Sequence, residues 1–413
     1  MTTQLDGIQC IDELEIENRR VFIRVDFNVP FDKKTGEITD ADRIQRAIPT
    51  IAHALERGAR VILGSHRGRP KGTAVDSLSL EPCAAKLSEL GGWEVFLPDD
   101  CLSDAAVKVI GELRAGQLCL LENLRFHPGE ESNDEGFARD LSDLFDVYVN
   151  DAFGAAHRAH ASVSALPKLI PERGMGFLLR DELKSLARLL EQPQKPFVAV
   201  LGGAKVSDKI GVIERLIVKS DALCIGGAMA NTFAAATGRE MAESLLQADG
   251  LPLARTLIEK ARDAGTKLLL PSDFVVADSA DANSGTVAVG GLTSGSMALD
   301  IGPKTVESFS AEIAAAKTVF WNGPMGLFEN PAFAAGSTGI AHALAETEAF
   351  SVVGGGDSAA AVRAAGDNLA SQLDFISTGG GAALELIEGK QLPGVEALRT
   401  TPRPIDPAEQ LPE

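Results

Sequence analysis

The sequence predicts an α/β protein with two doubly wound parallel sheets, and three features of its pattern support this prediction. Short, continuous runs of apolar and β-branched residues recur along the chain. Each run is followed by a glycine-rich or polar corner and then by a stretch with helical character. The runs form two series within 413 residues. Continuous apolar runs alternating with helices are typical of strands buried on both faces of a parallel sheet, and two series at this length indicate two domains.

The expected strands fall into one series in each half of the chain. The first series lies at residues 21–29, 60–64, 93–97, 118–121 and 147–149. The second lies at 197–201, 222–225, 267–270, 318–321, 350–353 and 374–376. Both domains are therefore expected to be Rossmann-like.

A connecting helix is expected over residues 172–192, because leucines recur there at helical spacing and prolines follow. The residues concerned are Leu179, Leu183, Leu186 and Leu190, then Pro193 and Pro196. The alternative is an ordinary surface helix of either domain. On this interpretation residues 1–171 form one domain, 193–385 a second, and 386–413 a segment that returns toward the first. The proline-rich tail beyond Leu398 is expected to be poorly ordered.

Composition narrows the class of protein. The formal net charge of −19 argues against broad binding to nucleic acid or to anionic membranes. No apolar run approaches the roughly 18 residues of a membrane-spanning helix, and the N-terminus lacks the pattern of a secretory signal. The five cysteines are scattered and never spaced Cys-x-x-Cys, which argues against a disulfide framework and a structural zinc site. A cytoplasmic protein is predicted.

In the first half, cationic and hydrogen-bonding residues follow the expected strands. Ligands of open parallel sheets bind beyond the carboxyl ends of the strands. The residues there include Arg24, Asp26, Asn28, Arg43, the segment Ser65-His66-Arg67-Gly68-Arg69-Pro70, Arg125, and the segment 150–160 with His157, Arg158 and His160. Each arginine alone is more often a solvated surface residue. The repetition against a strongly acidic background instead predicts a pocket for phosphate or carboxylate, which the guanidinium fork binds through two hydrogen bonds.

A metal site built from His66, His157 and His160 is the competing interpretation of the same segments. No carboxylate or thiolate accompanies these histidines at metal-binding spacing, and Arg158 would repel a cation. Anion binding is therefore favoured. His53, His127 and His342 are interpreted as structural.

The second half supplies glycine-rich corners, which are typical of phosphate sites because a bare backbone can approach a ligand closely. Lys205 and Lys209 are four residues apart, so both could reach a phosphate chain if a helix has begun. Asp357 is suited to Mg²⁺. The alternative for any one glycine pair is a tight strand-to-helix corner. The corners are 202–205, 226–229, 322–324, 354–358 and 378–381.

Two other functions compete with a phosphotransferase. The P-loop pattern is absent from the sequence, but residues 354–359 fit the loose dinucleotide pattern G-x-G-x-x-A. Asp374 follows at the expected distance, yet it precedes an apolar run rather than ending one, so a nicotinamide dehydrogenase is disfavoured. A non-catalytic anion-binding protein would have no need of Lys205 and Asp357.

The motifs of both halves resemble one family. Residues 24–30, 65–70, 121–127 and 150–160 resemble the N-terminal domain of the phosphoglycerate kinases. Residues 201–209, 321–329, 354–358 and 377–381 resemble the C-terminal domain, and the similarity runs in order from about Val21 to Leu398. The resemblance implies reversible, Mg²⁺-dependent phosphoryl transfer between 1,3-bisphosphoglycerate and ADP, giving 3-phosphoglycerate and ATP. It also favours a monomer.

The resemblance implies roles for individual residues. The three-carbon acid would be held by Asp26, Asn28, Arg43, His66, Arg69, Arg125 and Arg158. The nucleotide would be held by Lys205, Gly226, Gly227, Gly302, Glu329, Gly355, Gly356, Asp357 and Ser358, with Glu329 near the ribose and Asp357 on the metal. The phosphoryl group in transfer would be surrounded by Arg43, Lys205, Lys209, Gly356 and Gly380.

Three positions depart from the family pattern. Ala228 and Asn231 stand where many members have Gly and Tyr, which affects base recognition. Arg67 replaces a usual Leu and is expected only to add surface charge. The resemblance further implies that the reaction requires domain closure about the 172–192 helix, which would exclude water from the acyl phosphate.

Overall fold

The structure is a computed structural model that describes residues 4–32, 34–366 and 368–400. The chain forms two compact units. The first comprises Met1–Lys184 and Gln391–Glu413, and the second comprises Ser185–Lys390. The chain thus passes between the units twice, once inside a helix and once after Lys390.

The first unit contains a seven-stranded sheet in which every neighbouring pair is parallel, with the order β1-β7-β6-β2-β3-β5-β4. Its central strands are mostly apolar and buried, as the continuous runs predict, and polar residues such as Arg24 and Asn150 stand at their ends. The strands are β1 (Gln9–Cys10), β2 (Arg20–Arg24), β3 (Arg60–Gly64), β4 (Val95–Phe96), β5 (Leu118–Leu120), β6 (Val147–Asn150) and β7 (Arg173–Met175).

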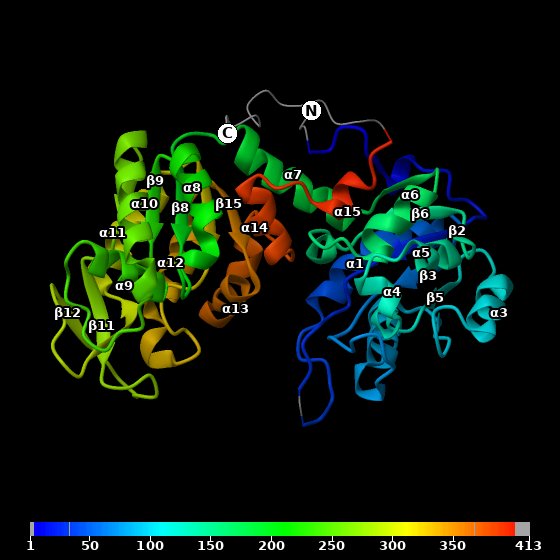
Figure 1. The fold of residues 1–413 in the computed structure, drawn as a ribbon, viewed down its shortest axis with the longest axis horizontal. Helices are drawn as coiled ribbons and strands as arrows, with labels where there is room; N and C mark the ends of the chain where they lie inside the picture. Colours follow the sequence, from blue (N-terminus) through cyan, green and yellow to red (C-terminus); the bar gives the residue numbers. More distant parts are fainter. Residues whose placement is uncertain (1–3, 33, 367, 401–413) are drawn as a thin grey trace. The chain divides into compact units, whose positions relative to one another are not determined.

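Helices cover both faces of this sheet (Figure 1). The first two helices pack against each other, and the fourth, fifth and sixth form a separate group. The helices are α1 (Asp42–Glu56), α2 (Glu81–Gly91), α3 (Asp104–Glu112), α4 (Pro128–Glu131), α5 (Glu135–Ser142), α6 (Leu166–Leu169), the first part of α7 (Phe177–Glu191) and α15 (Pro393–Glu396).

The second unit contains a six-stranded parallel sheet with the order β10-β9-β8-β14-β15-β16. One face carries a core of buried side chains, including Val200, Phe309, Trp321 and Ile340. The strands are β8 (Phe197–Leu201), β9 (Ala222–Ile225), β10 (Lys267–Leu269), β14 (Thr318–Asn322), β15 (Phe350–Gly354) and β16 (Phe375–Ile376). The prediction of two doubly wound parallel domains is confirmed.

The helices of the second unit form two layers (Figure 1). One layer consists of α8 (Ile210–Lys219), α9 (Gly227–Ala236), α10 (Leu251–Ala264) and α14 (Gly381–Glu388). The other consists of α11 (Pro303–Ala315), α12 (Ala335–Glu346) and α13 (Gly356–Ala365). None of the helices among the described residues is long and apolar enough to cross a bilayer.

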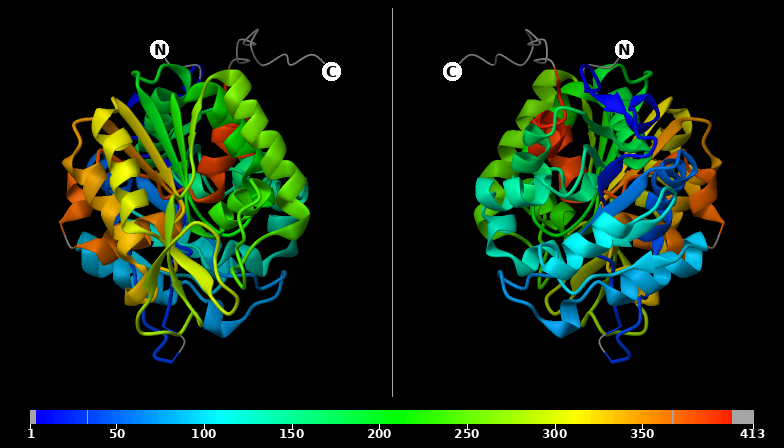
Figure 2. Two further views of the ribbon diagram at one scale, coloured as in Figure 1. Left: turned by 90° about the vertical axis from the view of Figure 1, so that its left-hand side faces the viewer. Right: turned by 90° about the vertical axis from the view of Figure 1, so that its right-hand side faces the viewer.

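A three-stranded antiparallel sheet in the second unit was not predicted. It consists of β11 (Asp273–Ala277), β12 (Thr286–Val289) and β13 (Met297–Ile301), which Figure 2 draws in yellow-green to yellow. Strand β12 has the short apolar sequence Thr-Val-Ala-Val but is mostly exposed, so an apolar run here does not mark a strand buried on both faces. Sequence periodicity is a weak signal for such a strand.

The helix expected over residues 172–192 begins later than predicted. Residues Arg173–Met175 form β7, which pairs with β6 and β1, and the helix α7 starts only at Phe177. Gly176 lies between the two elements. A side chain does not fit at this position, because a Cβ would lie 2.2 Å from Asp151 Oδ1. The unit boundary falls inside α7, after Lys184.

The residues just beyond Leu398 are anchored rather than loose. Arg399 donates from Nη2 to Gln4 O over 3.1 Å, and its own carbonyl accepts Arg173 Nη2 at 2.8 Å. The Thr400 amide donates to Gly7 O at 3.0 Å. The prediction of a poorly ordered tail beyond Leu398 is therefore wrong for these two residues, and the rest of that tail, 401–413, lies outside the described residues.

The strand order fixes where each unit can hold a ligand. In the first unit β2 has β3 on one side and β6 on the other. In the second, β8 has β9 on one side and β14 on the other. The connections on the two sides of β2, and likewise of β8, therefore run in opposite directions. Such a switch point opens a crevice at the carboxyl ends of the strands.

The first turn of α7 packs against a buried carboxyl group, that of Asp151. Asp151 Oδ1 accepts the Leu179 amide at 3.2 Å, while Thr50 Oγ1 accepts the Phe177 amide at 2.9 Å. Asp151 Oδ2 is buried without a hydrogen-bond partner. The pKa of Asp151 is raised to about 7, mainly by burial. Hydrogen bonds with Thr50 and the helix amides partly oppose this rise, and the charge of Asp181 adds to it.

We expect Asp151→Asn to flatten the pH dependence of stability. Because the folded-state pKa lies above the usual value of about 4, the folded protein binds more protons than the unfolded chain between about pH 4 and pH 7, so the Asp151 contribution to stability falls as pH rises through that window. Asn keeps the acceptor for Leu179 without the charge. Thermal unfolding of both proteins at pH 5 and pH 8 should show a smaller decrease for the variant, and equal decreases would contradict the assignment.

Candidate active site

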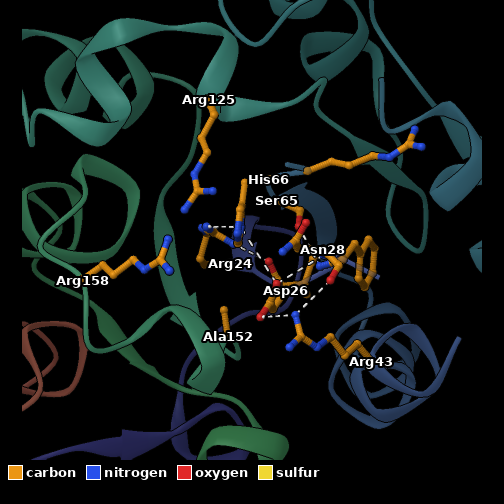
Figure 3. Close-up of polar contacts among 12 residues, drawn as sticks. Arg24, Asp26, Asn28, Arg43, Ser65, His66, Arg125, Ala152 and Arg158 are labelled. Carbon is orange, nitrogen blue, oxygen red and sulfur yellow. Dashed lines mark hydrogen bonds and ion pairs between the residues drawn. The ribbon is translucent and has the colours of Figure 1, made fainter. Parts of the chain in front are cut away.

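Arginine side chains of the first unit converge at the carboxyl ends of its central strands. Figure 3 shows Arg125, Arg158 and Arg43 pointing from three sides toward Asp26 and His66. These residues follow β5, β6, β2 and β3 or begin α1. The sequence prediction that separate strand-end segments form one basic cluster is therefore realised in the fold. We call this group, with Arg24, Asn28 and His160, the cation cluster.

Arg24 forms the buried base of the cation cluster. It is completely buried at the end of β2. Its Nε donates to Ser162 Oγ at 2.8 Å, Nη1 donates to the Val25 carbonyl, and Nη2 lies 3.2 Å from His66 Nδ1. Glu130 Oε1 is 4.0 Å away and also accepts the Ser162 hydroxyl at 2.6 Å. A buried guanidinium requires such partners, because its desolvation is otherwise very costly.

Asp26, Asn28 and Arg43 form the second part of the cluster. Arg43 Nη1 donates to Asp26 Oδ2 at 3.1 Å and to Asn28 O at 2.9 Å. Asn28 Oδ1 accepts the Gly68 amide at 3.0 Å, which ties the segment after β2 to the segment after β3. The Arg43 side chain is 35% exposed. Its remaining donors can therefore reach a ligand.

Arg125 and Arg158 line the cluster from β5 and β6. Arg125 is nearly buried, donates from Nη1 to Gly68 O at 2.7 Å, and has Nε 3.4 Å from Glu131 Oε1. Arg158 donates from Nε to His157 Nε2 at 3.3 Å, an imidazole nitrogen rather than a carboxylate oxygen. The pKa of Arg125 is lowered to about 10. Burial is the largest cause, Glu131 opposes it, and the charges of Arg158 and Arg24 act with it.

The electrostatics of the cluster favour an anion. Burial is the largest cause that lowers the pKa of His66 well below its usual value, followed by the charges of Arg24, Arg125 and Arg158. Burial and the same arginines lower the pKa of His160 to about 4. Both imidazoles are therefore neutral near pH 7. Burial is the main reason for this, and the nearby arginines act in the same direction. Arginines concentrated in this way attract anions and repel metal cations.

Arg67 and Arg69, the two arginines of the segment 65–70, do not take part in the contacts of the cation cluster. Arg69 is exposed, and the structure does not bring its side chain into the contacts described above. Arg67 was expected only to add surface charge, and that expectation is wrong. Its guanidinium lies 3.4 Å from the centre of the Phe31 ring, and Nη1 donates to Ser79 O at 2.7 Å. Arg67 thus fastens the segment after β2 to residues before α2.

The glycine corners after β8, β9 and β14 pack directly on one another. The Gly202 amide donates to Asn322 O at 2.9 Å, and the Gly227 amide donates to Met325 O at 2.9 Å. A Cβ at Gly202 would lie 2.1 Å from Pro324 O, and one at Gly227 only 2.6 Å from Gly203 N. Gly226 is likewise enclosed, with a Cβ position 2.4 Å from Met325 Sδ. These glycines are required by neighbouring protein atoms.

Lys205 and Lys209 occupy different environments. The helix α8 starts only at Ile210, so the condition under which both lysines would share one helical face is not met. Lys205 is exposed. Lys209 Nζ donates to Gly202 O at 2.6 Å, Asn322 Oδ1 at 2.6 Å and Asn322 O at 3.2 Å. Burial lowers the pKa of Lys209 to about 8, which the charges of Asp357 and Asp208 partly oppose.

The corners at the starts of α13 and α14 are open. A Cβ at Gly356 or Gly380 would meet no atom within 4 Å. Gly356 is the first residue of α13, and Gly380 precedes the first residue of α14. Because the first amides of a helix have no intrahelical acceptor, these positions present N–H groups to an anion. Gly355 has φ +93°, a conformation that favours glycine.

Asp357 and Ser358 follow Gly356 but face different surroundings. Asp357 is exposed in the first turn of α13. Ser358 is buried, and its Oγ accepts the Gly323 amide at 2.6 Å. The hydroxyl of Ser358 therefore joins α13 to the corner after β14.

A cavity of about 390 Å³ lies beside these corners within the second unit. Its size falls in the range of small-molecule sites. The antiparallel sheet that sequence analysis missed supplies much of its apolar wall, and the polar end carries Glu329 and Asp357. Residues lining it include Gly203, Gly227, Ala228, Asn231, Phe274, Met297, Leu299, Asp300, Met325, Leu327, Glu329 and Asp357.

Gly302 and Asp300 lie at or near this cavity, and neither has the surroundings of a simple ligand group. Gly302 is buried and would place a Cβ 2.3 Å from the Asp273 carboxyl carbon, and it is not among the lining residues. Asp300 lines the cavity but is 3% exposed, and its oxygens accept the Ile301 amide at 2.9 Å and the Gly336 amide at 2.6 Å. Burial raises the pKa of Asp300 to about 7.

Comparison with known proteins gives one consistent result. A family model described as phosphoglycerate kinase matches residues 11–390. A phosphoglycerate kinase of Anaeromyxobacter sp. (strain Fw109-5) is 53% identical over 95% of this chain and 99% of its own length, and that of Moorella thermoacetica is 52% identical over 94% and 98%. The solved structure of phosphoglycerate kinase from Coxiella burnetii, 40% identical, superposes with a TM-score of 0.85 over 95% of this chain and 98% of that one. That from Pyrococcus horikoshii OT3, 32% identical, has a TM-score of 0.80 over 94% and 98%.

The excess positive charge in the cation cluster can be tested by removing one arginine. We expect Arg125→Gln to raise the pKa of His160 from about 4 and to raise that of His66, because one of the charges that disfavour their protonation is lost. Neither should reach the ordinary value of about 6.5, since both rings stay buried. Titration of the imidazole resonances by NMR measures the shifts.

Arg57→Gln is the matched control, because Arg57 is an exposed arginine of the same unit at the end of α1. It should leave both histidines unchanged. If Arg125→Gln also left them unchanged, burial alone would set their pKa values, and the charge excess would have no support.

Proposed function

Because the chain belongs to the phosphoglycerate kinase family, it catalyses the reversible transfer of a phosphoryl group between 1,3-bisphosphoglycerate and ADP in glycolysis, and we propose that its two units divide the substrates between them. The cation cluster of the first unit binds the three-carbon acid. The cavity and open corners of the second unit bind the nucleotide. The family excludes both a nicotinamide dehydrogenase and a binding protein without catalysis.

The lowered histidine pKa values are the observation that most supports acid binding at the cation cluster. Burial is the largest cause of these shifts, and the charges of Arg24, Arg125 and Arg158 add to it, so each imidazole reports positive charge beside it. A substrate with a phosphate and a carboxyl group supplies the missing negative charge. Arg125 and Arg158 can each offer guanidinium donors to it, and Arg43 is exposed enough to reach the reacting end. We include Asp26, Asn28 and His66 as residues that position these groups, and Arg69 as a peripheral contact.

The cavity of the second unit fits a nucleotide base and ribose. Its wall of Phe274, Leu299 and Met325 suits a flat apolar base, and the exposed Glu329 at its polar end can accept ribose hydroxyl groups. We propose that Gly226, Gly227 and Gly302 act here by allowing the walls to pack closely. Ala228 and Asn231 both line the cavity, so the departures at these positions bear directly on base recognition.

The phosphates are assigned to the open corners. The amides of Gly355, Gly356 and Gly380 stand at or before helix N-termini, where they attract anions. Asp357 is exposed and lines the cavity, so its carboxylate fits as an oxygen ligand for Mg²⁺. A bound Mg²⁺ would neutralise negative charge on the nucleotide phosphates. Ser358 supports the corner through its bond to Gly323.

Catalysis then rests on positioning and charge neutralisation. The attacking carboxylate of 3-phosphoglycerate has an ordinary pKa near 4 and is ionised at neutral pH, so the forward attack requires no general base. We propose that Lys205, Arg43 and the amides of Gly356 and Gly380 neutralise charge on the phosphoryl group in transfer. Lys205 suits this role because its exposed ammonium group is available to a ligand.

Lys209 has a different proposed role from the one that its sequence position implies. Its ammonium group has three donors, and all three meet oxygens of Gly202 and Asn322. It can reach a phosphoryl group only by giving up at least one of these bonds. We therefore propose that Lys209 chiefly positions the ends of β8 and β14.

Closure, location and assembly are further parts of the proposal. The chain crosses between units only within α7 and after Lys390, so we propose that these crossings form the hinge that brings the two substrates together. All five cysteines are free and buried, as is typical of a reducing compartment, which supports a cytoplasmic enzyme. We propose that it acts as a monomer on small-molecule substrates, and light scattering on the purified chain measures the mass.

Lys205→Ala tests the catalytic assignment. We expect kcat to fall by roughly 10²- to 10³-fold, because about 3–4 kcal/mol of transition-state stabilisation is lost with one charged donor. The KM for 3-phosphoglycerate should change little. A coupled assay of ATP-dependent 3-phosphoglycerate phosphorylation measures both. Lys317→Ala is the control, since Lys317 is an exposed lysine of the same unit that follows α11, and a kcat for Lys205→Ala within twofold of the control would remove Lys205 from the mechanism.

Arg158→Ala tests acid binding by the cation cluster. Losing a charge-assisted hydrogen bond costs about 1.5–3 kcal/mol, so the KM for 3-phosphoglycerate should rise roughly 10- to 100-fold while the KM for ATP stays close to that of the unmodified enzyme. Arg139→Ala, which changes an exposed arginine on α5, should alter neither. An unchanged KM for the acid in Arg158→Ala would show that it binds elsewhere.

A further inference from the structure

We propose that Asp100, Cys101 and His127 form a binding site for a divalent transition-metal ion, with Zn²⁺ as the preferred ion, on the first unit. The Asp100 carboxylate, the Cys101 thiol and an imidazole nitrogen of His127 each offer one ligand atom, and these atoms lie within 4.8 Å of one another. His127 was predicted to be structural, and the spacing of the cysteines shows no zinc pattern. The cluster forms only in space, because 26 positions of sequence separate Cys101 from His127.

The distances within the cluster suit a tetrahedral ion. His127 Nε2 lies 3.1 Å from both Asp100 Oδ1 and Asp100 Oδ2. Zinc–nitrogen and zinc–oxygen bonds of about 2.0–2.2 Å at the tetrahedral angle separate two such ligand atoms by roughly 3.3 Å. An ion could therefore replace the direct contact between the imidazole and the carboxylate with only a small movement of either side chain.

The three side chains form a site with one open side. Cys101 is 1% exposed, whereas the side chains of His127 and Asp100 are 26% and 37% exposed. The sulfur thus lies at the base, and the nitrogen and oxygen ligands lie at the rim. A fourth ligand, a water molecule or a solute, can approach from solvent, as in zinc sites with three protein ligands.

Neighbouring groups hold each ligand in place. The Cys101 thiol donates to Glu122 O at 3.2 Å, and the His127 ring stacks on Phe137 with centroids 5.1 Å apart. Asp100 Oδ1 accepts the Leu102 amide at 2.8 Å. Such supporting contacts orient metal ligands and strengthen binding, because less side-chain freedom is lost when the ion arrives.

The ligand set selects the class of ion. A thiolate and an imidazole with one carboxylate suit Zn²⁺ and its neighbours in the transition series, while Mg²⁺ and Ca²⁺ prefer oxygen ligands alone. On binding, the sulfur–metal bond replaces the sulfur–hydrogen bond, and the thiol proton passes to solvent. This site is independent of the nucleotide-associated Mg²⁺ proposed at Asp357, which belongs to the second unit.

A bound ion would connect two segments that are separate in the sequence. Asp100 and Cys101 precede α3, and His127 lies between the short helix Leu124–Phe126 and α4. The ion would therefore cross-link the loop before α3 to the segment that also carries Arg125. We expect this cross-link to stabilise the first unit against unfolding, because an ion that binds the folded state alone shifts the equilibrium toward it.

Titration with Co²⁺ tests the site directly. The probe is added to the full-length chain, without an affinity tag, after treatment with a chelator and in the absence of nucleotide. We expect one Co²⁺ per chain, a sulfur-to-cobalt charge-transfer band in the near ultraviolet, and visible bands of four-coordinate intensity. Zn²⁺ should abolish these bands, and a large excess of Mg²⁺ should not. Zn²⁺ should also raise the Tm of the chain.

Variants at the ligands and at a matched cysteine decide the assignment. Cys101→Ser should abolish the charge-transfer band, and His127→Gln should weaken Co²⁺ binding by at least about tenfold. Cys83→Ser is the control, because Cys83 is another buried cysteine of the same unit whose thiol donates to a backbone carbonyl, Phe27 O. Absence of a cobalt–sulfur band in the unmodified chain, or its persistence in Cys101→Ser, would overturn the proposal. Circular dichroism establishes that each variant is folded, and the kinase assay reports separately on the proposed function.

Discussion

The buried guanidinium of Arg24 is the interaction on which the first half-site depends. It lies at the end of β2, where the strand order opens the crevice, and it joins elements that are distant in the sequence. Through Ser162 it is linked to Glu130 on α4, and through Nη2 it contacts His66 after β3. Because no solvent reaches this group, loss of any partner would leave a buried charge uncompensated, which is strongly destabilising.

One of the outer arginines, Arg43, is linked to this buried base through His66 and Asp26. His66 stands between Arg24 and Asp26, 3.2 Å from the first and 3.9 Å from the second. Asp26 in turn holds Arg43. The segment after each strand is thus fixed by the segment after its neighbour, so the ligand-facing side chains are positioned before any ligand arrives. Preorganisation of this kind reduces the ordering that binding would otherwise require.

The candidate site of the second unit also lies at the carboxyl ends of parallel strands, but it is built from backbone groups rather than from charged side chains. There the backbone itself forms the surface, because the corners after β8 and β14 pack at distances that exclude a Cβ. Lys209 holds these corners together from the inside, with its ammonium group on two backbone carbonyls and the Asn322 side chain. Gly356 and Gly380, by contrast, face open space. A glycine-rich corner therefore serves two purposes, and only contact geometry separates the packing glycines from those available to phosphate.

This distinction shows what the sequence could and could not predict. Strands such as Arg60–Gly64, Phe197–Leu201 and Ala222–Ile225 coincide with their apolar runs because they are buried on both faces. The two-residue strand β1 carries no such run, and β12 carries a short one although it is mostly exposed. Arg43, Arg125 and Arg158 were predicted to converge because parallel strands end at one edge.

By contrast, Glu130, Ser162 and the Asp100–Cys101–His127 group have no local pattern, since each depends on partners far along the chain.

The cation cluster also shows why a strongly acidic protein retains concentrated positive charge. In the free structure burial is the largest cause that lowers the pKa of Arg125 to about 10 and that of His160 to about 4, and the charges of neighbouring arginines act in the same direction. The folded protein therefore disfavours the charged form of Arg125, although this form is the one present near neutral pH. An anionic ligand offsets the repulsion among the arginines. The same charges that are unfavourable to one another in the free site thus contribute to its affinity for an anion.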